Sequence, residues 1–80
     1  MATILPFIIR SEASFDEYAT RAMGRAFDAA FADLQDTNLS ELVREIMAVR
    51  IIEAAKRGER DPQRLCRIAI AAIGGDQQTG

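Results

Sequence analysis

The sequence contains no histidine, no tryptophan and a single cysteine among its 80 residues. The lone cysteine, Cys66, cannot form a disulfide within the chain. Without histidine, neither a zinc site with imidazole ligands nor a serine or cysteine triad of the usual kind can form, and a metal site would need carboxylates alone. We therefore expect no cofactor and no enzymatic activity, and we interpret Cys66 as a buried structural thiol.

The sequence also lacks a long apolar run. Its most apolar stretch, residues 3–9, is far shorter than the roughly 20 residues needed to cross a membrane, and it has neither the basic leader nor the cleavage site of a signal peptide. The net charge of −2 gives little general attraction to nucleic acid or to an anionic membrane. We expect a cytoplasmic protein that does not contact membranes.

What is present is typical of a small folded domain. Hydrophobic residues make up 49% of the chain and charged residues 28%, which favours a folded helical protein over a disordered one. Domains near this size bury only about 60% of their unfolded surface, so a single core supplies roughly 3 to 5 kcal/mol. With disulfides and imidazole metal sites excluded, association with a second copy is the remaining route to stability.

Three capping patterns predict three helices within residues 14–74. In each pattern a short polar side chain precedes a segment of helical apolar spacing and can accept a hydrogen bond from the first turn. We expect the middle helix to end at Gly58 and the last one at Gly74 and Gly75. The predicted starts are Ser14 with Glu17, Asn38 with Glu41 or alternatively Ser40, and Asp61 with Pro62.

The segments that flank the three helices are expected to be irregular. Residues 1–13 are predicted to form an extended arm, because Pro6 disfavours a helix and the neighbouring residues favour extended structure. The apolar side chains of this arm would cover a groove on the same chain or on a partner. Residues 75–80 are polar and are predicted to be a disordered tail. The expected fold is all-α, a three-helix domain with an extended N-terminal arm, packed as a dimeric helical bundle.

The middle helix carries the strongest indication of a partner. Residues 46–55 are apolar on nearly every side, and such a helix is normally buried on every side, whereas two neighbouring helices of one chain would leave it partly open. Helical spacing also places Arg50 and Glu53 in its inward half, where they can pair or receive an anionic group. We therefore predict a homodimer, or binding to another protein, through Ile46, Met47, Val49, Arg50, Ile52, Glu53, Phe7, Ile8 and Ile9. Capture of a small ligand between helices, with Arg50 as its anchor, is a further possibility.

The turn around Gly58 indicates a different function. A helix, a short glycine-containing turn and a second helix resemble a helix-turn-helix in outline. Acidic residues are interleaved there, whereas DNA-binding domains usually present an uncompensated basic face. A small DNA-associated regulator is therefore the alternative function, with nucleic-acid contacts from Arg57, Arg60, Arg64 and Arg67.

One stretch of the sequence allows a comparison with a known group. Residues 50–62, RIIEAAKRGERDP, followed by Leu65, resemble a tail of short, functionally unassigned helical proteins of alpha-proteobacteria. The resemblance implies a cytoplasmic bacterial protein, and it carries over no active-site residue.

Overall fold

The computed structural model describes residues 4–34 and 40–73, and every regular element in this part of the chain is an α-helix. The elements are α1 (Leu5–Ser11), α2 (Glu17–Leu34), α3 (Glu41–Lys56) and α4 (Pro62–Ala72). The all-α class is thus confirmed, whereas the expected count of three helices is wrong because the N-terminal segment adds α1. Three predicted features lie outside the described residues, namely the cap at Asn38, the helix end at Gly74 and Gly75, and the tail 75–80.

The segment predicted to be an extended arm forms the helix α1. Pro6 stands in its first turn, where a backbone N–H would have no helical partner, so the proline does not interrupt the hydrogen bonding. The amides of Phe7 and Ile8 donate to the carbonyl of Ile4 at 3.0 and 3.1 Å. The helix ends at Glu12, whose φ of 61° is left-handed. Pro6 therefore marks a helix start rather than a helix break.

Capping side chains set the beginnings of the other helices. The carboxylate of Asp16 accepts a hydrogen bond from the amide of Ala19 at 2.8 Å, so Asp16 caps α2 and the predicted cap at Ser14 is wrong. A carboxylate two residues closer to the helix satisfies the first-turn donors in place of the Ser14 hydroxyl.

The boundaries of α3 and α4 follow the sequence closely. Ser40, the alternative to Asn38, accepts from the amide of Val43 at 3.2 Å. Asp61 accepts from the amide of Gln63 at 3.0 Å, with Pro62 next to it, as predicted. Gly58, with φ of 107°, ends α3, because glycine adopts this conformation without steric cost.

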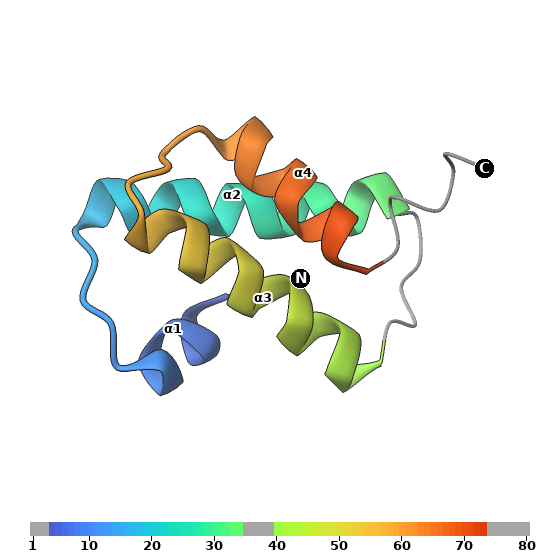
Figure 1. Ribbon diagram of the computed structural model, residues 1–80, viewed down its shortest axis with the longest axis horizontal. Coiled ribbons are helices and arrows are strands. Elements are labelled where there is room, and N and C mark those ends of the chain that lie inside the picture. Colours follow the sequence, from blue (N-terminus) through green and yellow to red (C-terminus); the bar gives the residue numbers. More distant parts are fainter. Residues whose placement is uncertain (1–3, 35–39, 74–80) are drawn as a thin grey trace.

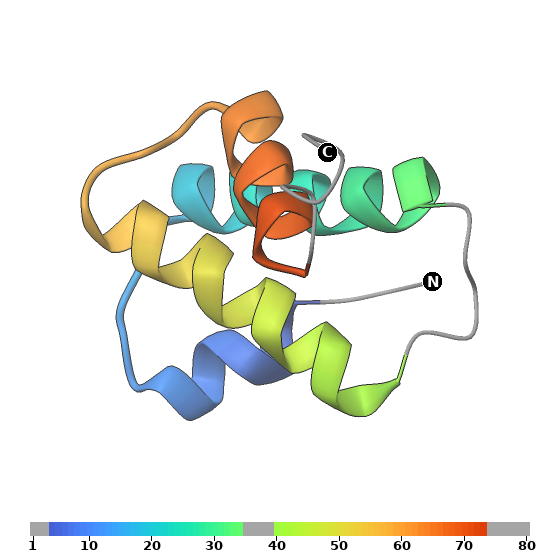
Figure 2. The same ribbon diagram turned by 45° about the vertical axis from the view of Figure 1, so that its right-hand side comes forward.

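Helix α3 lies between the other three. It crosses in front of α2 with α4 above it and α1 below it (Figure 1), and the turned view shows α1 and α4 on different sides of α3 (Figure 2). Helix α4 packs on both α2 and α3, while α1 packs on α3. Helices of the same chain therefore approach α3 from three directions.

The core contains side chains from all four helices. Phe27 of α2, Met47 and Ile51 of α3 and Leu65 of α4 are at most 1% exposed. The ring of Phe27 meets the ring of Phe7 edge-on with 6.0 Å between centroids, which links α1 to α2. Ile8 completes the contact of α1 with the core and is 8% exposed.

Two neighbouring isoleucines test the packing of α1. Ile8 is 8% exposed and Ile9 is 74% exposed. We expect Ile8→Ala to lower the free energy of unfolding by about 2 kcal/mol because it opens a cavity against the core, and Ile9→Ala to change it by less than about 0.5 kcal/mol. Urea denaturation of both variants measures the difference. Equal losses would contradict the helical packing of this segment.

Candidate interaction surface

The structure divides the nine predicted interface residues into a buried and an exposed group. Met47, Ile52 and Ile8 are at most 8% exposed and belong to the core of their own chain. Phe7 and Ile46 are partly exposed, and Val49, Arg50, Glu53 and Ile9 are exposed. Helix α1 thus supplies the neighbour that residues 46–55 were expected to take from a second subunit. Most of the apolar surface of α3 is covered without a partner.

The charged pair of α3 lies on the outside of the molecule. Arg50 Nη1 is 3.9 Å from Glu53 Oε1, with the side chains 58% and 47% exposed. The predicted pairing is confirmed, but the predicted inward position is wrong. An ion pair this exposed contributes at most about 1 kcal/mol, and Arg50 does not reach the space between helices where a ligand anchor was considered.

One apolar stripe of α3 remains uncovered. Leu42 is 65% exposed and Val49 41%, and Ile46 between them is partly exposed. Steps of four and three residues place these three side chains, which we call the α3 stripe, on one side of the helix. Helical spacing in the first half of this helix places Leu39, Leu42, Val43 and Ile46 on the opposite side from Glu41, Arg44 and Glu45, which predicts Leu42 to point inward. This prediction is wrong for Leu42. The stripe and its charged neighbours Glu45, Arg50 and Glu53 line a shallow depression.

The length of α1 explains why this part of α3 is open. Helix α1 has 7 residues and α3 has 16, so they are about 10 Å and 24 Å long. Helix α1 lies beside the C-terminal part of α3 in Figure 1. Leu42, in the first turn of α3, is at the other end.

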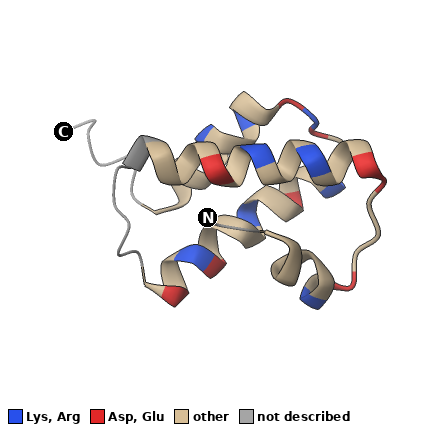
Figure 3. Ribbon diagram, turned by 180° about the vertical axis from the view of Figure 1, so that it is seen from behind, with Lys and Arg blue, Asp and Glu red and all other residues tan. Residues whose placement is uncertain are grey.

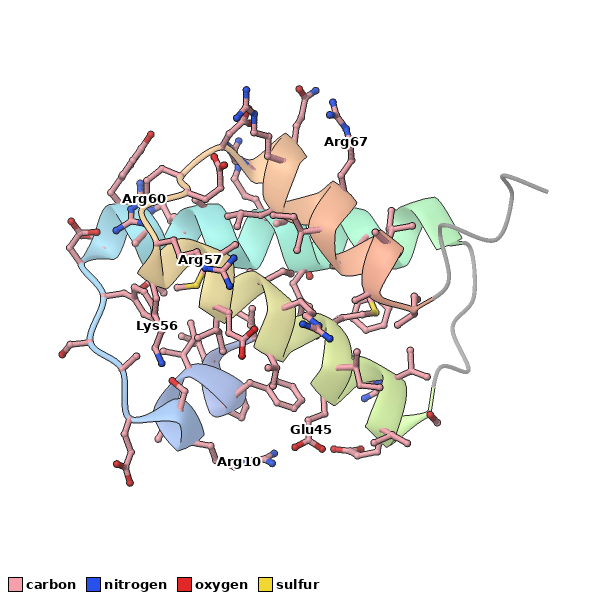
Figure 4. All side chains as sticks on the ribbon, viewed as in Figure 1. Arg10, Glu45, Lys56, Arg57, Arg60 and Arg67 are labelled. Atoms are coloured by element: carbon pink, nitrogen blue, oxygen red, sulfur yellow. The ribbon has the colours of Figure 1, made fainter. Side chains whose placement is uncertain are left out.

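A groove between α1 and α3 borders the stripe. The guanidinium of Arg10 lies 5.1 Å from the centre of the Phe7 ring. Arg10 and Glu45 extend toward the same end of the groove, and Lys56 is near its other end (Figure 4). Because two basic and two acidic residues share this groove, it favours neither anions nor cations. Its lining consists of Phe7, Arg10, Ser11, Glu45, Val49, Ile52, Glu53 and Lys56.

The four arginines predicted to contact nucleic acid serve different purposes. Arg60 Nη1 donates to the carbonyls of Ala55 and Glu59 at 2.8 and 2.9 Å, so this side chain caps the C-terminal end of α3. Arg64 lies 3.9 Å from a carboxylate oxygen of Glu59 and 4.0 Å from one of Asp61. Both arginines are thus partly occupied within the chain.

Arg57 and Arg67 are exposed, and no ion pair of either is found among the described residues. Arg57 extends in front of α3, whereas Arg67 extends from the outer side of α4 (Figure 4). Seen from behind, basic and acidic residues are interspersed over the ribbon (Figure 3). The predicted arginines therefore do not form one basic face.

A second open cleft lies between α2 and α4. Cys66 is partly buried there and packs against the core, so the predicted burial of this thiol holds in part. Arg25 and Asp28 of α2 and Arg67 of α4 line the cleft, so the two arginines share it with a carboxylate.

The described part of the chain offers no other site of recognisable chemistry. In residues 4–34 and 40–73, no three His, Cys, Asp or Glu side chains come together where they could hold a metal ion. Across the same residues, no helix has the length and apolar character required to cross a membrane. Comparison of the chain with protein-family models, with curated proteins and with solved structures gives no match.

The arginine at the end of α3 gives a direct test of its capping contact. Arg60 bonds two backbone carbonyls, whereas Arg57 is exposed one turn away. We expect Arg60→Ala to lower the free energy of unfolding by about 1 kcal/mol, the value of a partly exposed charged hydrogen bond. The matched control Arg57→Ala should stay within about 0.5 kcal/mol of the unchanged protein. Thermal and urea denaturation compare the two, and an equal effect would argue against the cap.

Proposed function

We propose that this chain is a non-enzymatic interaction protein of the cytoplasm that associates with a second copy of itself through the α3 stripe. The observation that carries the proposal is the exposure of Leu42 and Val49, 65% and 41%, in line with Ile46. Burying such side chains is favourable by about 25 cal/mol per Å² of apolar surface. A line of exposed apolar residues flanked by charges is typical of a binding surface.

A second copy is the partner that the stripe supports best. A two-fold axis places the same surface of two subunits face to face, so an apolar stripe meets an apolar stripe of the same length. The charged residues beside the stripe remain at the rim of such a contact, where they can pair with the other subunit. Another protein would need a stripe of its own that matches this spacing.

The small area of the stripe favours a weak dimer. Three side chains on one helix bury much less than the roughly 1,200 Å² of a stable interface. The core of the chain is also largely complete within one subunit, since Met47, Ile51 and Ile52 are at most 3% exposed. We therefore infer a monomer that folds by itself and associates in a concentration-dependent equilibrium.

Two equally exposed apolar residues on different helices test this proposal. Leu42 of α3 is 65% exposed and Tyr18 of α2 is 66% exposed. We expect Leu42→Lys to weaken self-association at least about tenfold, because it places a charge in the apolar contact, and Tyr18→Lys to leave it unchanged.

Sedimentation equilibrium over about a hundredfold range of concentration measures both variants and the unchanged chain. Circular dichroism checks that each variant is folded. An unchanged chain that stays monomeric throughout would refute the proposal and leave another protein as the partner of the stripe.

A small DNA-associated regulator is the second candidate function. The observation in its favour is the exposed side of Gln63, Arg64 and Arg67 in the first turns of α4, directly after the turn that follows α3. In helix-turn-helix proteins the corresponding part of the second helix contacts base edges. The carboxylates of Glu59 and Asp61 within 4.0 Å of Arg64 oppose this function, because they reduce the local positive charge.

A gel-shift titration with duplex DNA at low salt separates the two candidates. If the chain acts through the α3 stripe alone, we expect no shift of any duplex. If α4 binds DNA, the shift should be lost in Arg67→Ala, which removes a phosphate-contacting charge, and retained in Leu42→Lys. Retention of the shift in Arg67→Ala would contradict a role of α4.

A further inference from the structure

We infer that the two copies pair with their α3 helices parallel and in register, which makes each copy recognise the other through Glu45 and Arg50. This inference rests on the self-association proposed above. It adds the direction of the partner helix and the residues that select it.

The spacing along the exposed side of α3 is that of a coiled-coil seam. Leu42, Ile46, Val49 and Glu53 follow one another in steps of four, three and four residues. In a heptad with Ile46 at position a and Val49 at position d, these four residues and Lys56, which takes the next position d, form the seam that meets another helix. The seam is apolar in its first three positions and charged in its last two.

The residues beside the seam carry opposite charges on its two flanks. Glu45 occupies a g position and Arg50 the next e position, and both are exposed. In a parallel, in-register pair, a g residue of one helix faces the following e residue of the other, five positions later. Glu45 of each copy then faces Arg50 of its mate, so that the dimer contains this charge pair twice.

An antiparallel pair of α3 helices brings Glu45 and Arg50 of the two copies together less well. If such a pair is centred on the stripe near Ile46, a two-fold axis brings each flank of α3 against the same flank of the other helix. Glu45 of one copy then lies on the same side of the contact as Glu45 of the other copy, and the two Arg50 residues share the opposite side. Sliding the helices until Glu45 meets Lys56 leaves Leu42 beyond the end of the partner helix, since α3 ends at Lys56. The parallel pair alone combines full contact of the stripe with complementary charges.

Glu53 gives the parallel pair a distinctive weakness. As the fourth seam residue it faces the same residue of the other copy, and Lys56 in the fifth position does likewise, so like charges oppose association at this end of the seam. The guanidinium of Arg50, 3.9 Å away in the same chain, offsets part of this repulsion.

Charge reversal tests the pairing of Glu45 with Arg50. We expect Glu45→Lys and Arg50→Glu each to weaken dimerisation about tenfold, because each creates two like-charge contacts. The double variant E45K/R50E should return to within about threefold of the unchanged chain. Sedimentation equilibrium of the full chain measures all of them, and circular dichroism checks their fold.

Two controls separate local pairing from net charge. Arg25→Glu on α2, exposed and away from the stripe, changes the net charge as Arg50→Glu does and should leave dimerisation unchanged. The double variant E45K/R25E has the same net charge as E45K/R50E and should stay as weak as Glu45→Lys alone.

The outcomes distinguish this inference from the proposed function. If the unchanged chain dimerises but E45K/R50E does not restore the affinity, the parallel register is overturned while self-association stands. If single reversals have no effect, the dimer uses another surface and the inference is likewise overturned. If the unchanged chain is monomeric, the proposed function fails and the inference fails with it.

Discussion

The enclosure of α3 by its own chain is the constraint on which the rest of the structure depends. Met47, Ala48 and Ile52 of this helix are at most 3% exposed, and at 100° per residue they spread over roughly 140° of its circumference. Two helices can cover only two sides of such a surface. The chain therefore uses residues 5–11 as a third covering helix, with Phe7 and Ile8 turned to the core and Ile9 left in solvent.

The same constraint determines where a binding surface is left. Seven residues of helix cannot cover sixteen, so the described helices leave the apolar stripe of α3 partly exposed, and α1 borders it along the groove that Val49 lines. Leu42 shows this incomplete coverage most clearly, because it is as apolar as the core residues of α3 and yet 65% exposed. The surface available for a partner is thus a consequence of the unequal lengths of two helices rather than of a separate structural element.

How much of this the sequence could predict depends on whether a feature is local. Ser40, Gly58 and Asp61 act through hydrogen bonds or backbone angles within a few residues, and they locate both ends of α3 and the start of α4 correctly. Pro6 is ambiguous by local rules, since the same residue begins a helix in the first turn and breaks one in the interior. The contact of Phe7 with Phe27, 6.0 Å between ring centroids, is long-range and gives no signal in a single sequence. Leu42 is misjudged for the same reason, because helical spacing does not tell which side a neighbouring helix will cover.

The arginines show why counting charges in the sequence could not locate the site. Arg60 donates to two carbonyls at the end of α3, Arg64 lies between two carboxylates, and Arg50 stands beside an uncovered apolar stripe. The charge of Arg60 thus serves a helix cap, that of Arg64 is shared with two carboxylates, and that of Arg50, paired with Glu53 at 3.9 Å, lies at the rim of the stripe. Apolar contact has no direction of its own, so three exposed apolar residues can favour association without selecting an orientation. Selection must come from the charges at the rim, and on α3 the flanks of the stripe carry Glu45 on one side and Arg50 on the other.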